Sequence, residues 1–141
     1  MISLSQAQTI LAAALGHARA QSAKPLAGIV LDAGGHPIAF AREDGATIYR
    51  FNIASAKARG AIGMGDDTRV LAERAKGNPA FFQAVAVSVE GQIAFSPGGV
   101  LVRDAAGAVV GAVGLSGDTG DMDEECAIVG IKAAGLTGGP A

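Results

Sequence analysis

The stretch GAVGLSGDTGDMDEECAIVGIKAA, from Gly111 to Ala134, decides how this chain folds. Its first part is apolar and predicts a strand, the segment from Gly117 to Gly120 breaks that strand, and the remainder is an apolar run of helical length. Asp121, followed three residues later by Glu124, predicts a cap at the start of this helix. A strand that leads directly into a helix places the junction at one end of a sheet.

The junction is crowded with acids: five of the eight residues from Asp118 to Glu125 are Asp or Glu. Acids in the first turn of a helix interact favourably with its dipole, by about 0.3–1 kcal/mol each at exposed positions. Carboxylates on a short loop are also ligands for a hard cation such as Ca²⁺ or iron, although the spacing here is not that of an EF-hand. Helix capping is the favoured interpretation, and a ligand or metal role stays open with the metal unknown.

Outward from this stretch, the pattern predicts a first helix and two hairpins. Ser3 and Gln6 have the spacing of a capping box, and the helix that follows should end before Pro25. The segments 26–41 and 99–114 each contain two apolar runs separated by an Asp, small residues and Gly, which is typical of a hairpin turn. Two such hairpins supply most of an antiparallel sheet.

Between the hairpins the pattern is helical. A helix is expected from Ile48 onward, a short one over Thr68 to Ala75, and a further helical start at Asn78 and Pro79. The run from Phe81 to Val89 fits either helix or strand, with a short helix favoured at its beginning. One face of the helix after Ile48 combines cations with small groups. Its residues are Arg50, Ile53, Lys57, Gly60 and Met64.

These elements predict an α+β fold in the order helix, two strands, two or three short helices, about three strands, helix. Strands that do not alternate one-to-one with helices favour a profilin-like or PAS-like sandwich, with an antiparallel sheet of about five strands flanked by helices. A chain of 141 residues corresponds to one domain. We expect this domain to span residues 1–137 and residues 138–141 to form a flexible tail.

Composition narrows the class of protein. The chain has 11 Lys and Arg against 13 Asp and Glu, and no basic run interleaved with aromatics, so we expect no nucleic-acid partner. The N-terminal segment resembles neither a signal peptide nor a membrane span, which predicts a cytoplasmic protein without a membrane partner. The single cysteine, Cys126, excludes an intramolecular disulfide and every multi-cysteine zinc pattern.

A few side chains have chemistry that suits a binding or catalytic site. His17 lies at the edge of the buried face of the first helix, where packing is the common role and ligation the alternative. Lys57 is expected either to pair with an acid of the 118–125 loop or to bind a ligand carboxylate. The backbone N–H groups around Ser116 and Gly117 are placed to hold a small anionic group. Two histidines are too few, in these positions, for a Ser-His-Asp triad.

The segments NIASAKARGA, PGGVLV and GAVVGAVGLSGDTGDMDEECA, together with VLDAGGHPIAFAREDGA, resemble the GlcG/HbpS family, which also forms the C-terminal part of PduO-type proteins. The resemblance covers nearly the whole chain. It implies a profilin-like fold, association into dimers or larger homo-oligomers and, for some members, haem binding with a proposed haem-degrading role. Family members often carry Thr where this chain has Gly60.

The resemblance also assigns residues by position. It places Lys57 in a lysine-alanine helix motif, Gly98 and Gly99 in a glycine pair before the second hairpin, and a C-terminal signature over two short segments. These are Ser116 with Gly117, and Asp123 with Glu124. No haem ligand is fixed by the motif, and His17 is the candidate.

Three functions follow. The first is a small-ligand-binding protein that takes haem or a related tetrapyrrole, with His17, Lys57, Gly98, Gly99, Ser116 and Gly117 as candidate binding residues. The second is a small metabolic enzyme or accessory subunit acting on a carboxylated metabolite, with Lys57 holding the substrate and Asp123 or Glu124 as acid or base, because a like-charged neighbour can tune a carboxylate. The third is a self-associating scaffold without catalysis.

Overall fold

The structure is a computed structural model that describes residues 1–140. Its elements are five helices and four strands, whose order along the chain is helix, two strands, three helices, two strands, helix. The helices are α1 (Leu4–Ala20), α2 (Arg50–Met64), α3 (Thr68–Gly77), α4 (Pro79–Ser88) and α5 (Gly120–Ala133). The strands are β1 (Ala27–Asp32), β2 (Pro37–Arg42), β3 (Gly99–Arg103) and β4 (Val109–Ser116).

The four strands form one antiparallel sheet in the order β2-β1-β4-β3. Both predicted hairpins are present, and they join through β1 and β4, where Ala27 lies opposite Ser116 and Asp32 opposite Gly111. The two most buried strands are therefore in the middle, and β2 and β3 are the edges. The junction of Gly111 to Ala134 thus begins at a central strand.

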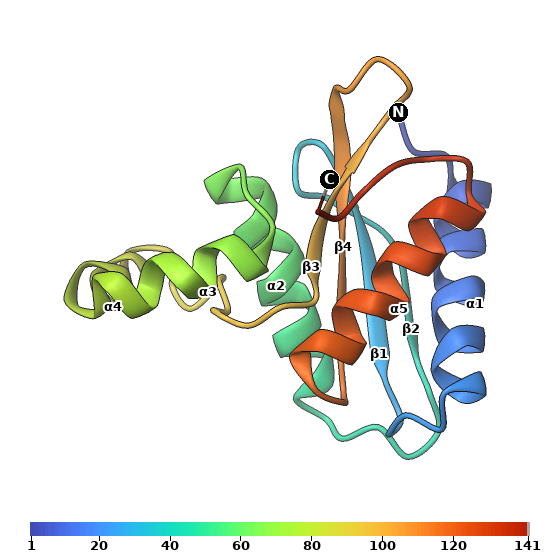
Figure 1. Cartoon of the computed structure of the whole chain (residues 1–141), viewed down its shortest axis with the longest axis horizontal. Coiled ribbons are helices and arrows are strands. Elements are labelled where there is room, and N and C mark those ends of the chain that lie inside the picture. The colour runs from blue at the N-terminus through green and yellow to red at the C-terminus, as the bar shows by residue number, and fades with distance from the viewer. Residues whose placement is uncertain (141) are drawn as a thin grey trace.

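Helices cover both faces of the sheet, as Figure 1 shows, with α1 and α5 on one side and α2 on the other. The larger core cluster lies between the sheet and α1 with α5, and includes Ile10, Leu26, Val113 and Ile131. A smaller cluster under α2 contains Ala54, Ala58 and Ala61. Alanines on α2 let the helix axis approach the sheet closely, as expected for a core poor in aromatics.

The α+β class and the helical cover are confirmed, whereas the predicted strand count is wrong. The sheet has four strands where about five were expected, and three helices separate the hairpins, within the expected two or three. The run from Phe81 to Val89, for which the sequence allowed either a helix or a strand, belongs almost entirely to α4. The helix that was favoured for its beginning is present, because Pro79 occupies the first turn. Residues 93 to 98 then cross back to β3 without forming a strand.

Local signals at the helix ends were partly correct. The capping box of Ser3 and Gln6 is present in both directions, at 3.0 Å for each hydrogen bond. The predicted cap of α5 is wrong, because the cap is Thr119, whose hydroxyl accepts from the Met122 N–H at 3.2 Å. Asp121 lies inside the first turn, and its carboxylate pairs with an arginine of α3.

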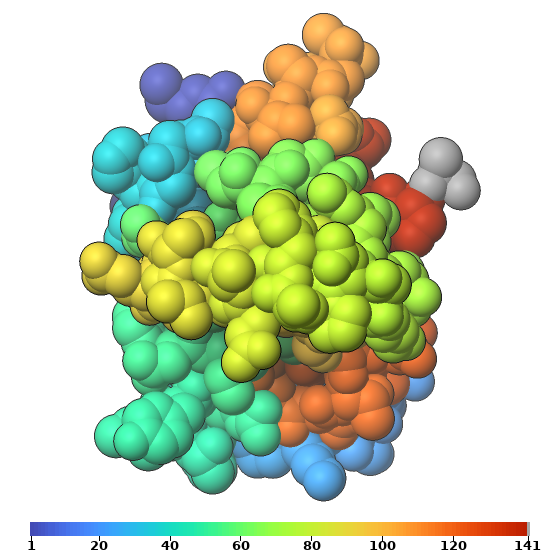
Figure 2. Space-filling model, turned by 90° about the vertical axis from the view of Figure 1, so that its left-hand side faces the viewer, coloured from blue at the N-terminus to red at the C-terminus, as the bar shows by residue number. Residues whose placement is uncertain are grey.

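Two further features concern the outline of the molecule. Helices α3 and α4 extend from the sheet as an arm, drawn yellow-green to yellow in Figure 1, and Figure 2 shows this arm crossing the face that it presents to the viewer. Near the C-terminal end of the chain, Thr137 forms an isolated bridge with Arg103 of β3. Among residues 1–140, no helix combines the length and apolarity needed to span a bilayer.

Candidate functional site

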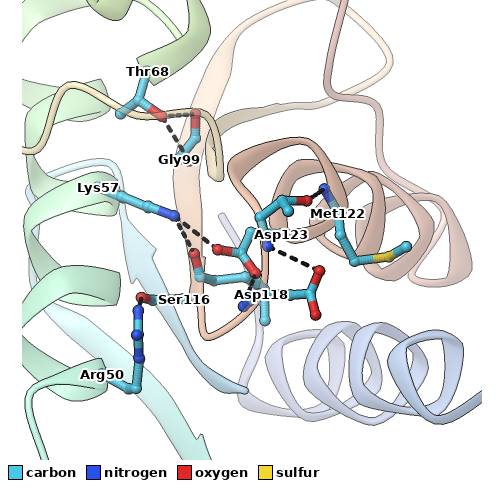
Figure 3. Close-up of polar contacts among 10 residues, drawn as sticks. Arg50, Lys57, Thr68, Gly99, Ser116, Asp118, Met122 and Asp123 are labelled. Atoms are coloured by element: carbon cyan, nitrogen blue, oxygen red, sulfur yellow. Dashed lines mark hydrogen bonds and ion pairs between the residues drawn. The ribbon is translucent and has the colours of Figure 1, made fainter. Parts of the chain in front are cut away.

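A buried ion pair joins α2 to α5 beside the end of β4. The Lys57 Nζ donates to Asp123 Oδ2 and to the Leu115 carbonyl, both at 3.0 Å, and the two side chains are only 3% and 2% exposed. The other oxygen of Asp123 accepts from the Asp118 N–H at 3.0 Å (Figure 3). The predicted pairing of Lys57 with an acid of the 118–125 loop is therefore confirmed.

Burial and pairing act on Lys57 in opposite directions. Loss of solvent lowers the pKa of its ammonium group, the Asp123 carboxylate opposes this shift, and the nearby Arg50 adds to it, with the net result below the ordinary value. Arg50 itself donates to the buried hydroxyl of Ser116 at 3.1 Å. Two cations from α2 therefore converge on the end of β4, and one of them is neutralised there.

Gly98 and Gly99, at the start of β3, allow α2 to approach the sheet. Gly98 has φ +126°, and a Cβ there would lie 2.7 Å from the Lys57 Nζ and 2.8 Å from the Leu115 carbonyl oxygen. A Cβ on Gly99 would lie 2.6 Å from the Thr68 methyl, while the Gly99 N–H donates to the Thr68 hydroxyl at 2.8 Å. Because neither residue has a Cβ, the space beside them is free for the Lys57 side chain and its ion pair with Asp123.

The remaining acids of the junction also have partners. Asp118 accepts from the Lys24 N–H and the Thr119 N–H, each at 2.8 Å, and these backbone bonds lower the pKa of its carboxyl group. The Arg69 guanidinium of α3 pairs with Asp121 and, through its Nε at 3.0 Å, with Glu124, and these hydrogen bonds raise the pKa of Arg69.

Glu125 pairs with His17. Asp121 and Glu124 therefore share Arg69, while the other acids have separate partners. Residues 1–140 contain no cluster of three or more His, Cys, Asp or Glu that would hold a metal ion. The sequence offered no signal for Arg69, because α3 and α5 meet only in the folded chain.

The structure therefore brings most of the predicted site residues together. Lys57, Gly98, Gly99, Ser116, Gly117, Asp123 and Glu124 all lie around the junction. The ion pair is closed to solvent in this arrangement, which is the geometry of a structural pair. Catalytic roles for Lys57, Asp123 and Glu124 stay predictions.

His17 lies apart from this group, on the opposite side of the sheet from α2. Its Nε2 is 2.7 Å from Glu125 Oε2 of α5, and the two side chains are 23% and 54% exposed. The other histidine, His36, is 80% exposed in the hairpin turn and contacts Asp32. His17 is therefore the more sheltered imidazole, and it is held by a carboxylate.

A cavity of about 470 Å³ lies between α2, the β1–β2 hairpin and the turn at residues 90–92. One wall is apolar and comes from the sheet, with Ile29 and Leu31 of β1 and Phe40 of β2. The other wall is the polar face of α2, with Asn52, Ser55 and Arg59 at helical spacing. The sequence pattern does not single out this face.

Comparisons with known proteins agree with this fold. The model of the family described as haem-degrading HbpS-like proteins matches residues 2–132. The crystal structure of a PduOC–heme complex has a TM-score of 0.85 at 22% identity, covering 95% of each chain. Protein ORFY of Klebsiella pneumoniae has a TM-score of 0.85 at 24% identity, over 95% of this chain and 90% of that chain.

A structure of HbpS itself has a TM-score of 0.78 at 27% identity, over 92% of this chain and 87% of that chain. The comparison with curated proteins gives no match. The likenesses below 25% identity establish the fold alone, whereas the family model covers almost the whole chain.

Proposed function

Because the chain belongs to the family of haem-degrading HbpS-like proteins, we propose that it binds haem or a related tetrapyrrole. The family includes HbpS, and a structural relative, PduOC, has been crystallised with heme. The observation in this chain that carries the proposal is the contact of His17 with Glu125. Histidines that bind metals commonly have their second ring nitrogen held by a carboxylate or a carbonyl.

His17 would hold the iron of a bound haem, and Glu125 would orient its imidazole. The imidazole is partly sheltered between α1 and α5, and its partner Glu125 is 54% exposed. The contact with Glu125 engages Nε2, so Nδ1 is the ring nitrogen that would hold an iron atom while Glu125 orients the ring. When bound, haem supplies an iron centre with one protein ligand, and this chain supplies the imidazole and the carboxylate that orients it.

A titration with hemin tests the proposal directly. We expect a shifted, saturable Soret band with the unaltered protein and its loss with His17→Ala. The matched control is His36→Ala, which removes the exposed histidine of the hairpin turn and should bind like the unaltered protein. Glu125→Gln should weaken binding without abolishing it, because it keeps a hydrogen-bonding group near the ring.

The absence of any shifted band would reject this function, and equal binding by both histidine variants would reject His17 as the ligand. The first result would leave the scaffold and the metabolite-binding alternatives. The second would leave haem binding in place but remove His17 as its ligand.

A further inference from the structure

We propose that the cavity between α2 and the β1–β2 hairpin is a binding site for a small apolar carboxylate. The first observation is an orphan hydroxyl. Ser55 lines the cavity, is 9% exposed, and its Oγ is the buried side-chain oxygen without a hydrogen-bond partner among residues 1–140. A buried hydroxyl without a partner costs free energy, and in native proteins such a group usually bonds to a ligand or to an ordered water.

The position of Ser55 makes it part of a set. Asn52 precedes it by three residues and Arg59 follows it by four, so all three lie along one face of α2 and line the same cavity. Arg59 is exposed and has no ion-pair partner in the described part of the chain. A guanidinium without a partner beside a buried hydroxyl is suited to a carboxylate, since both groups donate hydrogen bonds to it.

The wall opposite is suited to an apolar body. It consists of Ile29 and Leu31 from β1 with Pro37 and Phe40 from β2. Phe40 also meets Phe51 of α2 edge to face, with ring centroids 4.9 Å apart, although these rings are 40% and 45% exposed. Large aromatics left open to solvent at the mouth of a cavity are typical of ligand sites, which commonly measure about 300–1,000 Å³.

The third side is the turn at residues 90–92. Glu90 has φ +56°, in the left-handed region that non-glycine residues rarely adopt, and it precedes Gly91 at φ +75°. Such backbone strain clusters at ligand-binding segments. In Figure 2 the end of α4 and this turn, drawn yellow, lie below the cyan turn of the β1–β2 hairpin, and the cavity is lined by the turn at residues 90–92 together with residues of β1 and β2.

These observations define the ligand by its chemistry. The apolar wall selects an aromatic or branched aliphatic body, and Ser55 with Arg59 selects a carboxylate. Glu90 repels a second negative charge, which favours a monocarboxylate. The described residues that line the cavity include no His, Cys, Met or Tyr, so the site is distinct from an iron site at His17 and is independent of the haem proposal.

Calorimetric titration of the intact protein with three matched probes tests the site. The probes are phenylacetate, its neutral analogue phenylacetamide, and the cation phenethylamine. We expect saturable binding of phenylacetate, with the amide at least about tenfold weaker because it lacks the charge that Arg59 recognises. Binding of the amide or the cation as tightly as the acid, or of none of the three, would overturn the proposal.

Two variants locate the site. Arg59→Gln should weaken phenylacetate binding about tenfold, while Arg42→Gln should leave it unchanged, because Arg42 is an exposed arginine of β2 that lines a different hollow with Arg19 and Glu43. Equal effects of the two substitutions would place the carboxylate elsewhere and contradict the proposal.

Ser55→Ala gives a pair of readouts with opposite signs. It should weaken phenylacetate binding about fivefold, and it should raise the melting temperature of the free protein because it removes a buried hydroxyl that has no partner. A Ser55→Ala protein that melts lower than the unaltered one and binds phenylacetate normally would show that the hydroxyl serves packing. That result would also overturn the proposal that this cavity binds a carboxylate.

Discussion

The Lys57 ammonium and the Asp123 carboxylate are 3.0 Å apart, and both side chains are almost completely removed from solvent. Charges in such a position attract each other strongly, but each also loses its hydration. The net contribution of the pair to stability is therefore small compared with the cost of removing one partner. This asymmetry makes the pair a sensitive point of the junction between β4 and α5.

Lys57→Met should lower the free energy of unfolding by about 3–5 kcal/mol, because it leaves the Asp123 carboxylate buried without a cation. Lys57→Met with Asp123→Leu should recover much of that loss. Urea denaturation gives both values. The control is Lys76→Met, whose pair with Glu73 is 74% and 70% exposed and should be worth less than about 1 kcal/mol. Similar losses of unfolding free energy for Lys57→Met and Lys76→Met would show that burial of the Lys57–Asp123 pair does not raise the cost of breaking it.

Cys126 allows a pH-dependent test. Its side chain is fully buried, and burial, assisted by the negative charge of Asp123, raises the pKa of the thiol from 9.0 to about 11. The folded state therefore keeps a proton that the unfolded chain releases. The resulting stability is fully present below about pH 9 and decreases as pH rises toward 11.

Between pH 8 and pH 11, the free energy of unfolding of the unaltered protein should fall by roughly 2 kcal/mol more than that of Cys126→Ala. The reason is that a tenfold difference in proton affinity between the folded and unfolded states corresponds to about 1.36 kcal/mol. Denaturant midpoints of the two proteins across this range provide the measurement. Taking the difference between the two proteins cancels the contribution of every other titrating group to the pH dependence. A constant difference across the range would show that the thiol does not ionise differently in the two states.

At the scale of elements, the packing of α1 against α5 depends on small residues. Gly130 of α5 faces α1, and a Cβ there would lie 3.1 Å from both the Ala14 Cβ and the Ile10 Cγ2. Gly16 is also inside a helix, yet a Cβ at this position would meet nothing within 4 Å. The two glycines share a helical backbone and differ in their surroundings.

Gly130→Ala should therefore destabilise the protein by about 1–3 kcal/mol, because the added methyl forces the two helices apart. Gly16→Ala should stabilise it by roughly 0.4–1 kcal/mol through the lower entropy of the unfolded chain. Thermal unfolding followed by circular dichroism distinguishes the signs. A destabilising effect at Gly16 or a stabilising effect at Gly130 would refute this account of the helix contact.

Among the elements, the features that depend on residues close together in the chain could be predicted from the sequence. Ser3 with Gln6, and the two Asp-to-Gly turns, are local signals, and the cap and the hairpins formed where they were expected. The pairing of Lys57 with the acidic loop was also anticipated, from charge alone. The cavity at Ser55 was not, because a hydroxyl on a helix gains meaning only when the opposite strands and the 90–92 turn are in place.

The wrong strand count has a similar origin. The run from Phe81 to Val89 is apolar apart from Gln83 and Ser88, and it carries no period that separates helix from strand. The cap of α5 shows the same limit, since Thr119 and Asp121 are both good capping residues and the choice depends on where the chain leaves Gly117. Asp121 and Glu124, which do not cap the helix, pair with Arg69 instead.

Considered as a whole, the molecule has an arm whose apolar surface is not covered. Within α4 only Phe82 is buried, and the helix packs on α3 and not on the sheet. Phe81, Val87 and Val89 are 51%, 75% and 39% exposed at and just beyond this helix. Exposed apolar side chains that gather on one element commonly mark a contact with another protein, so this arm is suited to contact with another chain.

We expect the covering chain to be a second copy of this protein, as the family resemblance implies. Phe81→Ser with Val87→Glu should then reduce the mass measured by sedimentation at least about twofold, because burying an unpaired carboxylate at an apolar contact costs several kcal/mol. Both side chains are exposed in the single chain, so its fold should persist. Leu4→Glu, at a 55% exposed position on α1, is the matched control and should leave the mass unchanged. If the unaltered protein sediments as a monomer, or if the control dissociates it as effectively, then α4 is not the contact between copies.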